Sequence, residues 1–186
     1  MRLSEAEPAN LTGSLLVATP ALLDPNFRRT ILFLTHHDHE EGALGIILNR
    51  PRADLLGGLG EGNPELASVP VFEGGPVEKD HLLLARLIIA KGTACFQSFN
   101  SDADPPGYAA GDIQELRAFT GYAGWSAGQL ESEIMEKSWL TMPPSPGLLE
   151  RVLTTEEGVA RWRGLMRELG PWYHLMAEAP DDPGLN

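Results

Sequence analysis

Three short, almost uninterrupted apolar runs are the feature that most narrows the folds open to this chain. They occupy residues 14–18, 30–35 and 43–48. A strand with one face in water alternates apolar and polar residues, whereas these runs are apolar at nearly every position, which indicates strands covered on both faces. The polar, glycine-terminated segment 36–42 predicts a hairpin loop between the second and third runs. We therefore expect the three runs to form the interior of a sheet.

Weaker patterns predict further elements around this sheet. Pro20 and Pro51 end the first and third runs, and Gly170-Pro171 ends the clearest helical pattern. That helix begins after a segment with capping-box spacing at 154–157. In chain order, the expected elements are a short helix and loop at 54–68, a brief strand at 71–73, a strand at 81–89, a loop at 100–112, a strand at 116–122, a helix at 129–137 and a helix at 159–169.

Length and composition indicate one domain without a membrane anchor. A chain of 186 residues, 42% of them hydrophobic, fits one domain with a sizeable core. No apolar run approaches the ~20 residues that cross a bilayer, and residues 1–8 lack the apolar stretch of a signal peptide. We expect a flexible lead at 1–10, one α/β domain at 11–178 and a polar tail at 179–186. Cytoplasmic localisation follows, with the single Cys95 as a small buried hydrophobic residue.

The charge balance weighs against broad contact with nucleic acid. Fourteen basic and 26 acidic side chains give a formal net charge of −12. Such a field repels phosphate backbones, whose neutralisation supplies most non-specific nucleic-acid affinity. Direct nucleic-acid binding is therefore disfavoured unless arginines cluster locally.

The segment 124–128 fits the G-x-S-x-G pattern of serine hydrolases. In those enzymes the serine lies on a tight turn from a strand to a helix, which is the context expected here for Ser126. The partners of a triad are missing from the pattern, because His174 is the only downstream histidine and lies in a segment that resembles a tail. The alternative is that the glycines permit a sharp turn beside Trp125. We expect no catalytic residue here.

Residues 36–41, His-His-Asp-His-Glu-Glu, contain side chains that suit zinc or nickel. Neighbouring side chains of an extended turn point to different sides, so adjacent ligands rarely meet at one ion. A solvated hairpin tip is the favoured interpretation, with no metal site and no cofactor. Gly74-Gly75-Pro76 leaves two alternatives: a kink at a strand end, or a turn whose backbone amides contact an anion.

Two arginine-bearing segments are predicted to meet at one end of the sheet. Residues 24–29 precede the second apolar run, and Asn49-Arg50 follows the third. Because a hairpin makes these runs antiparallel, Arg29 and Asn49-Arg50 should lie together at its open end. One interpretation is a set of ion pairs with Asp24 or Glu131 as the acceptor. The other is a recess for an anionic or carbonyl-bearing ligand, since the arginine fork suits planar oxyanions.

The spacing of several motifs resembles the YqgE/AlgH family. The resemblance covers about residues 11–170, nearly the whole chain. It rests on Gly13-x-Leu15-Leu16-Val17-Ala18-x-Pro20, Asp24-x-x-Phe27-x-Arg29, Gly42-Ala43-x-Gly45-Ile46-x-x-Asn49-Arg50-Pro51, Gly74-Gly75-Pro76-Val77 and Gly121-Tyr122-Ala123-Gly124-Trp125-x-x-Gly128-Gln129-Leu130-Glu131.

This resemblance implies a mixed α/β domain around a bent or branched, mostly antiparallel sheet flanked by helices. The family is bacterial and largely uncharacterised, and one branch is described as a transcriptional regulator. A serine at position 126 is not part of the family pattern, and the loop 100–112 is shorter than the family usually has. The implied ligand-binding positions are Asp24, Phe27, Arg29, Asn49, Arg50, Gly74, Gly75, Pro76, Trp125, Gln129 and Glu131.

From these observations the leading hypothesis is a non-enzymatic regulatory or adaptor protein. It would bind a small anionic ligand or a protein partner through the predicted recess. A transcriptional regulator that contacts nucleic acid is the first alternative, and a serine hydrolase that uses Ser126 is the second.

Overall fold

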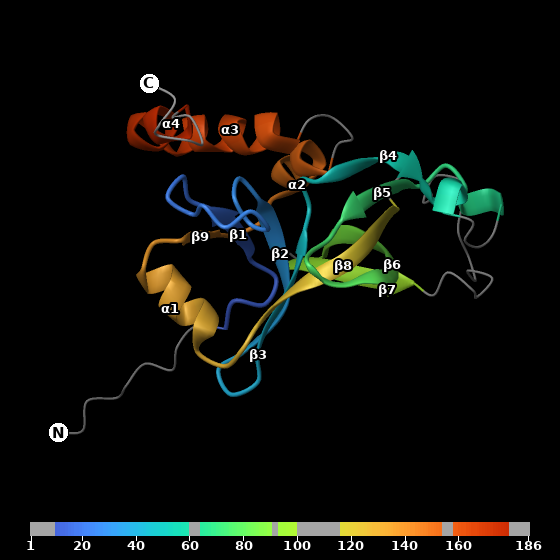
Figure 1. Ribbon diagram of the computed structural model, residues 1–186, viewed down its shortest axis with the longest axis horizontal. Coiled ribbons are helices and arrows are strands. Elements are labelled where there is room, and N and C mark those ends of the chain that lie inside the picture. Colours follow the sequence, from blue (N-terminus) through green and yellow to red (C-terminus); the bar gives the residue numbers. More distant parts are fainter. Residues whose placement is uncertain (1–9, 60–63, 91–92, 100–115, 154–157, 179–186) are drawn as a thin grey trace.

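The protein is a mixed α/β fold built on one bent and branched sheet (Figure 1). The computed structural model describes residues 10–59, 64–90, 93–99, 116–153 and 158–178. The strands are β1 (Leu15–Ala18), β2 (Ile31–Asp38), β3 (Gly42–Ile47), β4 (Pro51–Leu55), β5 (Pro70–Glu73), β6 (Val77–Ala90), β7 (Thr93–Phe99), β8 (Arg117–Trp125) and β9 (Trp139–Met142). The helices are α1 (Gln129–Met135), α2 (Pro146–Val152), α3 (Gly158–Leu169) and α4 (Pro171–Ala177), with short 3₁₀ turns η1 (Leu56–Leu59) and η2 (Pro64–Leu66).

Strand β8 is the branch point of the sheet. The main path runs in the order β4-β5-β8-β3-β2-β1-β9, and β6 also pairs with β8 while carrying β7 on its other side. The first half of β8 lies between β5 and β6, and its second half pairs with β3. Among the pairings of the described residues only β5–β8 is parallel. The bent or branched, mostly antiparallel sheet implied by the family resemblance is thus confirmed.

Helices cover both faces of the sheet where β1, β2 and β3 lie, which explains the apolar runs. All four residues of β1 are fully buried. Alternate residues of β1, β2 and β3 pack against α2, α3 and α4 on one face, and the intervening residues pack against α1 on the other. The Trp162 indole of α3 donates to the Ala18 carbonyl at 2.7 Å, which ties the helical layer to β1. Figure 1 shows α3 and α4 along one edge of the view and α1 beside β9.

The predicted strands and two predicted helices are confirmed, with three corrections. First, β2 extends through His36, His37 and Asp38, because β3 offers them pairing partners after a bulge, so the turn is shorter than residues 36–42. Second, Pro51 does not only end a strand but begins the edge strand β4, a position where proline is tolerated. Third, His174 lies in helix α4 and not in a tail. Strands β7 and β9 and helix α2 were not predicted.

Several predictions lie outside the described residues. They are the flexible lead at 1–9, the loop 100–112, the capping box at 154–157, the polar tail at 179–186 and the side chain of Cys95. Within the described part of the chain, no helix has the length and apolar character needed to span a bilayer.

Candidate functional site

The open end of the β2–β3 hairpin brings Arg29, Asn49 and Arg50 together, as the sequence predicts. The Asn49 side chain is buried and its amide is saturated by backbone groups. Its oxygen accepts from the Ile31 N–H at 2.8 Å, and its nitrogen donates at 3.0 Å to the carbonyls of Arg29 and Gly158. This asparagine therefore joins the segment after β3 to residues 29–31 and to the start of α3, and both of its side-chain N–H donors are used.

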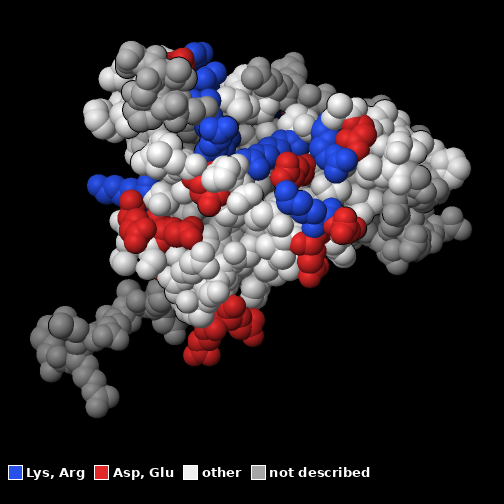
Figure 2. Space-filling model, in the orientation of Figure 1, with Lys and Arg blue, Asp and Glu red and all other residues white. Residues whose placement is uncertain are grey.

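The side chains of Arg29 and Arg50, which belong to the predicted recess, contact other residues of the protein. The Arg29 guanidinium lies 5.8 Å from the centre of the Trp162 ring, a cation–π arrangement. The Arg50 guanidinium donates to the Pro25 carbonyl at 3.3 Å and lies 3.9 Å from a Glu73 carboxylate oxygen. Burial lowers the pKa of Arg50 more than the Glu73 charge raises it. In the middle of the face in Figure 2, basic and acidic side chains lie next to one another.

Two other predicted residues of this end also serve local structure. The exposed Asp24 side chain accepts from the Asn26 N–H at 2.8 Å and so shapes its own turn. Phe27 stacks on Trp125, with ring centres 6.0 Å apart, and packs edge-on against Trp139 at 5.8 Å. Glu131, which one interpretation placed here as an ion-pair acceptor, lies instead at the opposite end of β2.

The Gly74-Gly75-Pro76 turn crosses β8 at close range. A Cβ atom at Gly74 would overlap the Gly121 carbonyl, and one at Gly75 would overlap the backbone of Tyr122. The Gly74 N–H donates to the Thr120 carbonyl, and its own carbonyl accepts from Ile47. The close approach of backbones explains the two glycines, which favours the kink over the anion-contact alternative.

The turn from β8 to α1 has the predicted strand-to-helix form but lacks the features of a nucleophile elbow. The left-handed conformation falls on Gly128 (φ 74°), and Ser126 is not among the described residues with positive φ. The Ser126 N–H donates to the Gln129 side-chain oxygen at 3.0 Å. His36 and Ser126 border the same hollow, yet no hydrogen bond joins these two described residues. Ser126 therefore takes part in the start of α1, since its carbonyl also accepts from the Gln129 N–H at 3.0 Å.

Glu133, which the sequence did not single out, anchors α1 to the sheet. One of its carboxylate oxygens accepts from the indole N–H groups of Trp125 and Trp139 at 2.9 and 2.7 Å. Its other oxygen accepts from the Gln129 amide at 3.0 Å. Both tryptophans are almost fully buried. Trp125 and Gln129 are thus committed to the attachment of α1.

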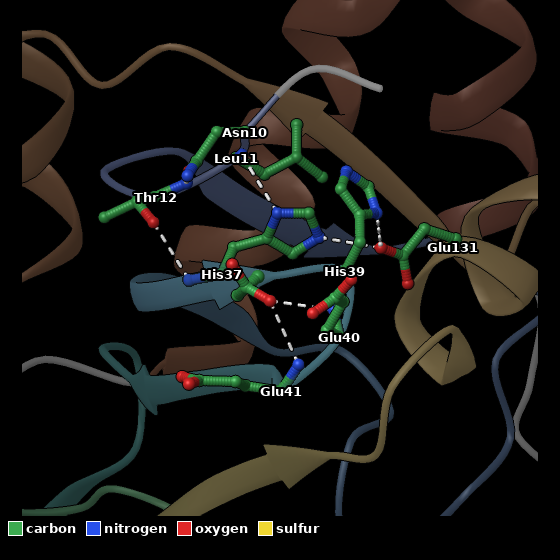
Figure 3. A network of polar contacts seen from close by, with 9 residues as sticks. Asn10, Leu11, Thr12, His37, His39, Glu40, Glu41 and Glu131 are labelled. Atoms are coloured by element: carbon green, nitrogen blue, oxygen red, sulfur yellow. Dashed lines mark hydrogen bonds and ion pairs between the residues drawn. The ribbon is translucent and has the colours of Figure 1, made fainter. Parts of the chain in front are cut away.

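At the tip end of β2, three side chains point at one another: His37, His39 and Glu131 (Figure 3). A single Glu131 oxygen lies 3.0 Å from His37 Nε2 and 2.7 Å from His39 Nδ1. The Leu11 N–H donates to His37 Nδ1 at 3.2 Å, so the proton of a neutral His37 ring sits on Nε2 and is donated to Glu131. We call these three residues the histidine–glutamate cluster.

The position of this cluster distinguishes its members from ordinary surface groups. The His37 side chain is only 1% exposed, and Glu131 is 31% exposed. Burial raises the pKa of the Glu131 carboxyl, but the hydrogen bond from its own backbone amide and the two imidazoles together hold that pKa below its ordinary value. The expectation that neighbouring ligands diverge holds for His36 and His37, which lie on opposite faces of β2. It did not consider that the turn after β2 could bring His39 to the side of the strand on which His37 lies.

A shallow hollow of about 480 Å³ lies on the opposite face of the same strands. We call it the hairpin groove, and its main lining residues are His36, Glu41, Leu44, Val77, Tyr122 and Ser126. Leu44 pairs with His36 on one side and Gly124 on the other, so these residues form a row across the sheet. The side chains of Leu44 and Val77 are 44% and 37% exposed, although both are large and apolar.

A smaller hollow of about 90 Å³ lies between α2 and α3. Two charged residues at its border, Arg151 and Glu168, pair with each other at 2.6 Å. Its size admits a few water molecules. The hairpin groove and the histidine–glutamate cluster are therefore the stronger candidates for a functional site.

Comparison with known proteins places the chain among AlgH-like sequences. Residues 15–174 match the AlgH-like family model. The chain is 38% identical over 194 residues to a UPF0301 protein of Streptomyces avermitilis, covering 97% of each chain. It is 39% identical over 183 residues to a UPF0301 protein of Chlorobaculum tepidum, covering 94% of this chain and 95% of that relative.

Two solved structures resemble the fold. One is the solution structure of the AlgH protein from Pseudomonas aeruginosa, with a TM-score of 0.63 and 27% identity, covering 96% of this chain and 99% of that one. The other is the crystal structure of a protein from Corynebacterium diphtheriae, with a TM-score of 0.66 and 23% identity, covering 95% of each chain. The likeness to the Corynebacterium diphtheriae protein shows a similar fold and nothing more.

Proposed function

The chain belongs to the AlgH-like family, and we propose that it is a non-enzymatic cytoplasmic adaptor that binds an extended segment of a partner protein in the hairpin groove. The observation that carries this proposal is the uncovered apolar surface at the tip end of β3. Ile46 faces the same side of β3 as Leu44, yet Ile46 is covered by the α2–α4 layer and Leu44 is not. Exposed apolar patches with a polar rim are typical of protein-binding surfaces.

The chemistry of the groove defines the segment that would fit. Leu44 and Val77 offer apolar contacts, and Gly124, next to Leu44 in the sheet, leaves space above the strands. The Glu41 carboxylate at the rim is 76% exposed and lies 3.4 Å from His36. A partner segment with an apolar side chain followed by a lysine or arginine would match both features, and the net charge of −12 would favour its approach.

The test uses peptides selected on the purified protein from a random peptide library, with affinities measured by fluorescence anisotropy. Leu44→Glu and Val77→Glu should each weaken binding at least tenfold, because a carboxylate would be buried against the apolar segment. Leu23→Glu is the matched control, since Leu23 is an exposed leucine (66%) outside the groove. Equal binding by Leu44→Glu and the wild type, or equal loss in Leu23→Glu, would overturn the proposal.

A small anionic ligand at Arg50 is a second candidate, favoured by one observation. The Arg50 guanidinium is partly buried, and its nearest described carboxylate oxygen, on Glu73, is 3.9 Å away and also 3.5 Å from Lys79. A phosphate or carboxylate could therefore improve on the ion pair that Arg50 now has. Titration with inorganic phosphate, followed by NMR, should shift resonances near Arg50 in the wild type and not in Arg50→Gln. Identical shifts in both proteins would remove this candidate.

The nucleic-acid alternative finds less support in the arrangement of charges. Several described arginines are paired with acids on the surface, among them Arg52 with Asp54 and Arg151 with Glu168. A gel-shift series at falling salt concentration tests this alternative, since phosphate contacts strengthen steeply as salt falls. The hydrolase alternative is tested by a fluorophosphonate probe, which should label the wild type and Ser126→Ala equally if Ser126 is not a nucleophile.

A further inference from the structure

The histidine–glutamate cluster has the composition and spacing of a metal site. Two imidazoles come from one face of β2 and the turn after it, and a carboxylate comes from the first turn of α1. The three ligand atoms lie within 4.8 Å of one another. Two imidazoles and one carboxylate form a ligand set that zinc accepts with three protein ligands, leaving a further position for water or another group.

We propose that His37, His39 and Glu131 bind a divalent transition-metal ion of the zinc class. This site does not depend on the hairpin groove, because it lies on the other face of β2. The Glu131 oxygen is already 3.0 Å from His37 Nε2 and 2.7 Å from His39 Nδ1. Two ligands of a tetrahedral ion with bonds of about 2.0–2.1 Å are roughly 3.3 Å apart. The ion would therefore replace the shared hydrogen bonds after a small outward movement of the side chains.

The Leu11 backbone adds a constraint that links metal binding to the N-terminal segment. Its N–H donates to His37 Nδ1, which keeps the proton of the neutral ring on Nε2, the atom that faces Glu131. A metal ion at Nε2 takes the lone pair of that nitrogen, so the single N–H proton of the neutral ring moves to Nδ1, where it needs an acceptor. The Leu11 N–H would then face another donor. Metal binding should therefore turn Leu11 away from His37.

His36 provides the matched control for this site. It precedes His37 in β2, is also a histidine, and faces the hairpin groove, where it lies 3.4 Å from Glu41. His39 is 37% exposed, so its replacement by alanine should leave the fold intact, which circular dichroism would verify. The two variants remove one imidazole each from the same short segment and differ in whether that imidazole belongs to the cluster.

The experiment is calorimetric titration of the chelator-treated protein with zinc chloride. The wild type and His36→Ala should bind one equivalent, whereas His39→Ala and Glu131→Gln should bind at least tenfold more weakly. Cobalt(II) titration gives an independent readout, because its visible absorption reports the coordination number and geometry of the bound ion. No stoichiometric binding to the wild type, or equal weakening in His36→Ala and His39→Ala, would overturn the proposal.

A further variant tests the role of Leu11. Leu11→Pro removes the N–H that donates to His37, so it should bind zinc more tightly than the wild type, by about threefold or more. Weaker binding in a folded Leu11→Pro would contradict the proposed coupling between metal binding and the N-terminal segment.

Discussion

The two ends of strand β2 differ in what their polar groups contact. At the open end, the Asn49 side chain makes three hydrogen bonds to backbone groups of two segments, residues 29–31 and the start of α3. At the tip end, His37 and His39 both contact one Glu131 oxygen, and Leu44 faces an open groove. A polar side chain that hydrogen-bonds to buried backbone groups stabilises a fold. Side chains that share one acceptor can instead give up that contact and bind a ligand. The difference is the reason that we assign a structural role to Asn49 at the open end and propose binding at the tip end.

The largest expected effect is the loss of stability in Asn49→Ala. The change leaves the buried N–H of Ile31 and the carbonyls of Arg29 and Gly158 without their partner. Each unsatisfied buried group costs about 1–3 kcal/mol, so we expect the free energy of unfolding to fall by about 3–5 kcal/mol. Urea denaturation followed by circular dichroism measures this change.

Asn10→Ala is the control for this substitution. Asn10 is exposed, and its side chain accepts from the Thr12 N–H at 2.8 Å. Its replacement should cost less than about 1 kcal/mol. A loss in Asn49→Ala as small as that in Asn10→Ala would mean that the open end does not hold the fold together.

The sequence predicted the sheet better than it predicted the site, for a physical reason. The runs at 14–18, 30–35 and 43–48 are buried on both faces, and burial is what an apolar pattern reports. Short elements whose stability comes from tertiary contacts were missed. Strand β9, for example, has four residues that pair with β1, and nothing local distinguishes them from a loop.

The sequence indicated which residues would gather at the open end of the hairpin. It did not indicate which groups their side chains would contact. Asn49 and Arg29 were predicted to lie together, and they do. The sequence pattern does not show that the Asn49 amide is hydrogen-bonded to backbone groups. Glu131 was assigned to the wrong end, because its position depends on how α1 packs against β2 and β3. The i, i+2 spacing of His37 and His39 was the available signal for the cluster, but His39 lies in the turn after β2, where the side-chain alternation of a strand no longer applies.

A second prediction concerns which residues stabilise the tip end of β2. The structure points to Glu133, because the indoles of Trp125 and Trp139 both donate to it. Glu133→Ala should lower the free energy of unfolding by about 2 kcal/mol, since two buried N–H groups lose their acceptor. In chelator-treated protein, His39→Ala should cost less than about 0.5 kcal/mol because His39 is partly exposed. The reverse ranking would assign the structural role to the cluster.

A third prediction compares two residues on one face of β3. Ile46 is 3% exposed and Leu44 is 44% exposed. Ile46→Val should cost about 1 kcal/mol through loss of one buried methylene. Leu44→Thr should change stability by no more than about 0.5 kcal/mol, although it removes more apolar surface. Thermal unfolding of both variants tests this, and a larger loss in Leu44→Thr would show that the groove is part of the core.

The smallest effect concerns an exposed ion pair in the helical layer near the open end. Arg151 donates to Glu168 at 2.6 and 3.2 Å, and both side chains are 53% exposed. The hydrogen bond from Arg151 holds the pKa of Glu168 below its ordinary value of 4.5. A carboxyl whose pKa is lower in the folded state contributes stability above the unfolded pKa and loses it as the pH falls through the folded pKa.

Arg151→Gln should therefore cost a few tenths of a kcal/mol near neutral pH, as exposed pairs usually do, and nothing once Glu168 is protonated. The cost of Asn49→Ala should persist over the same pH range, because an amide does not titrate. Urea denaturation of both variants near pH 7 and at the lowest pH that keeps them folded compares the two. If the cost of Asn49→Ala also vanished on acidification, the stability of the open end would depend on charged groups. It would then not come from the hydrogen bonds of the Asn49 amide.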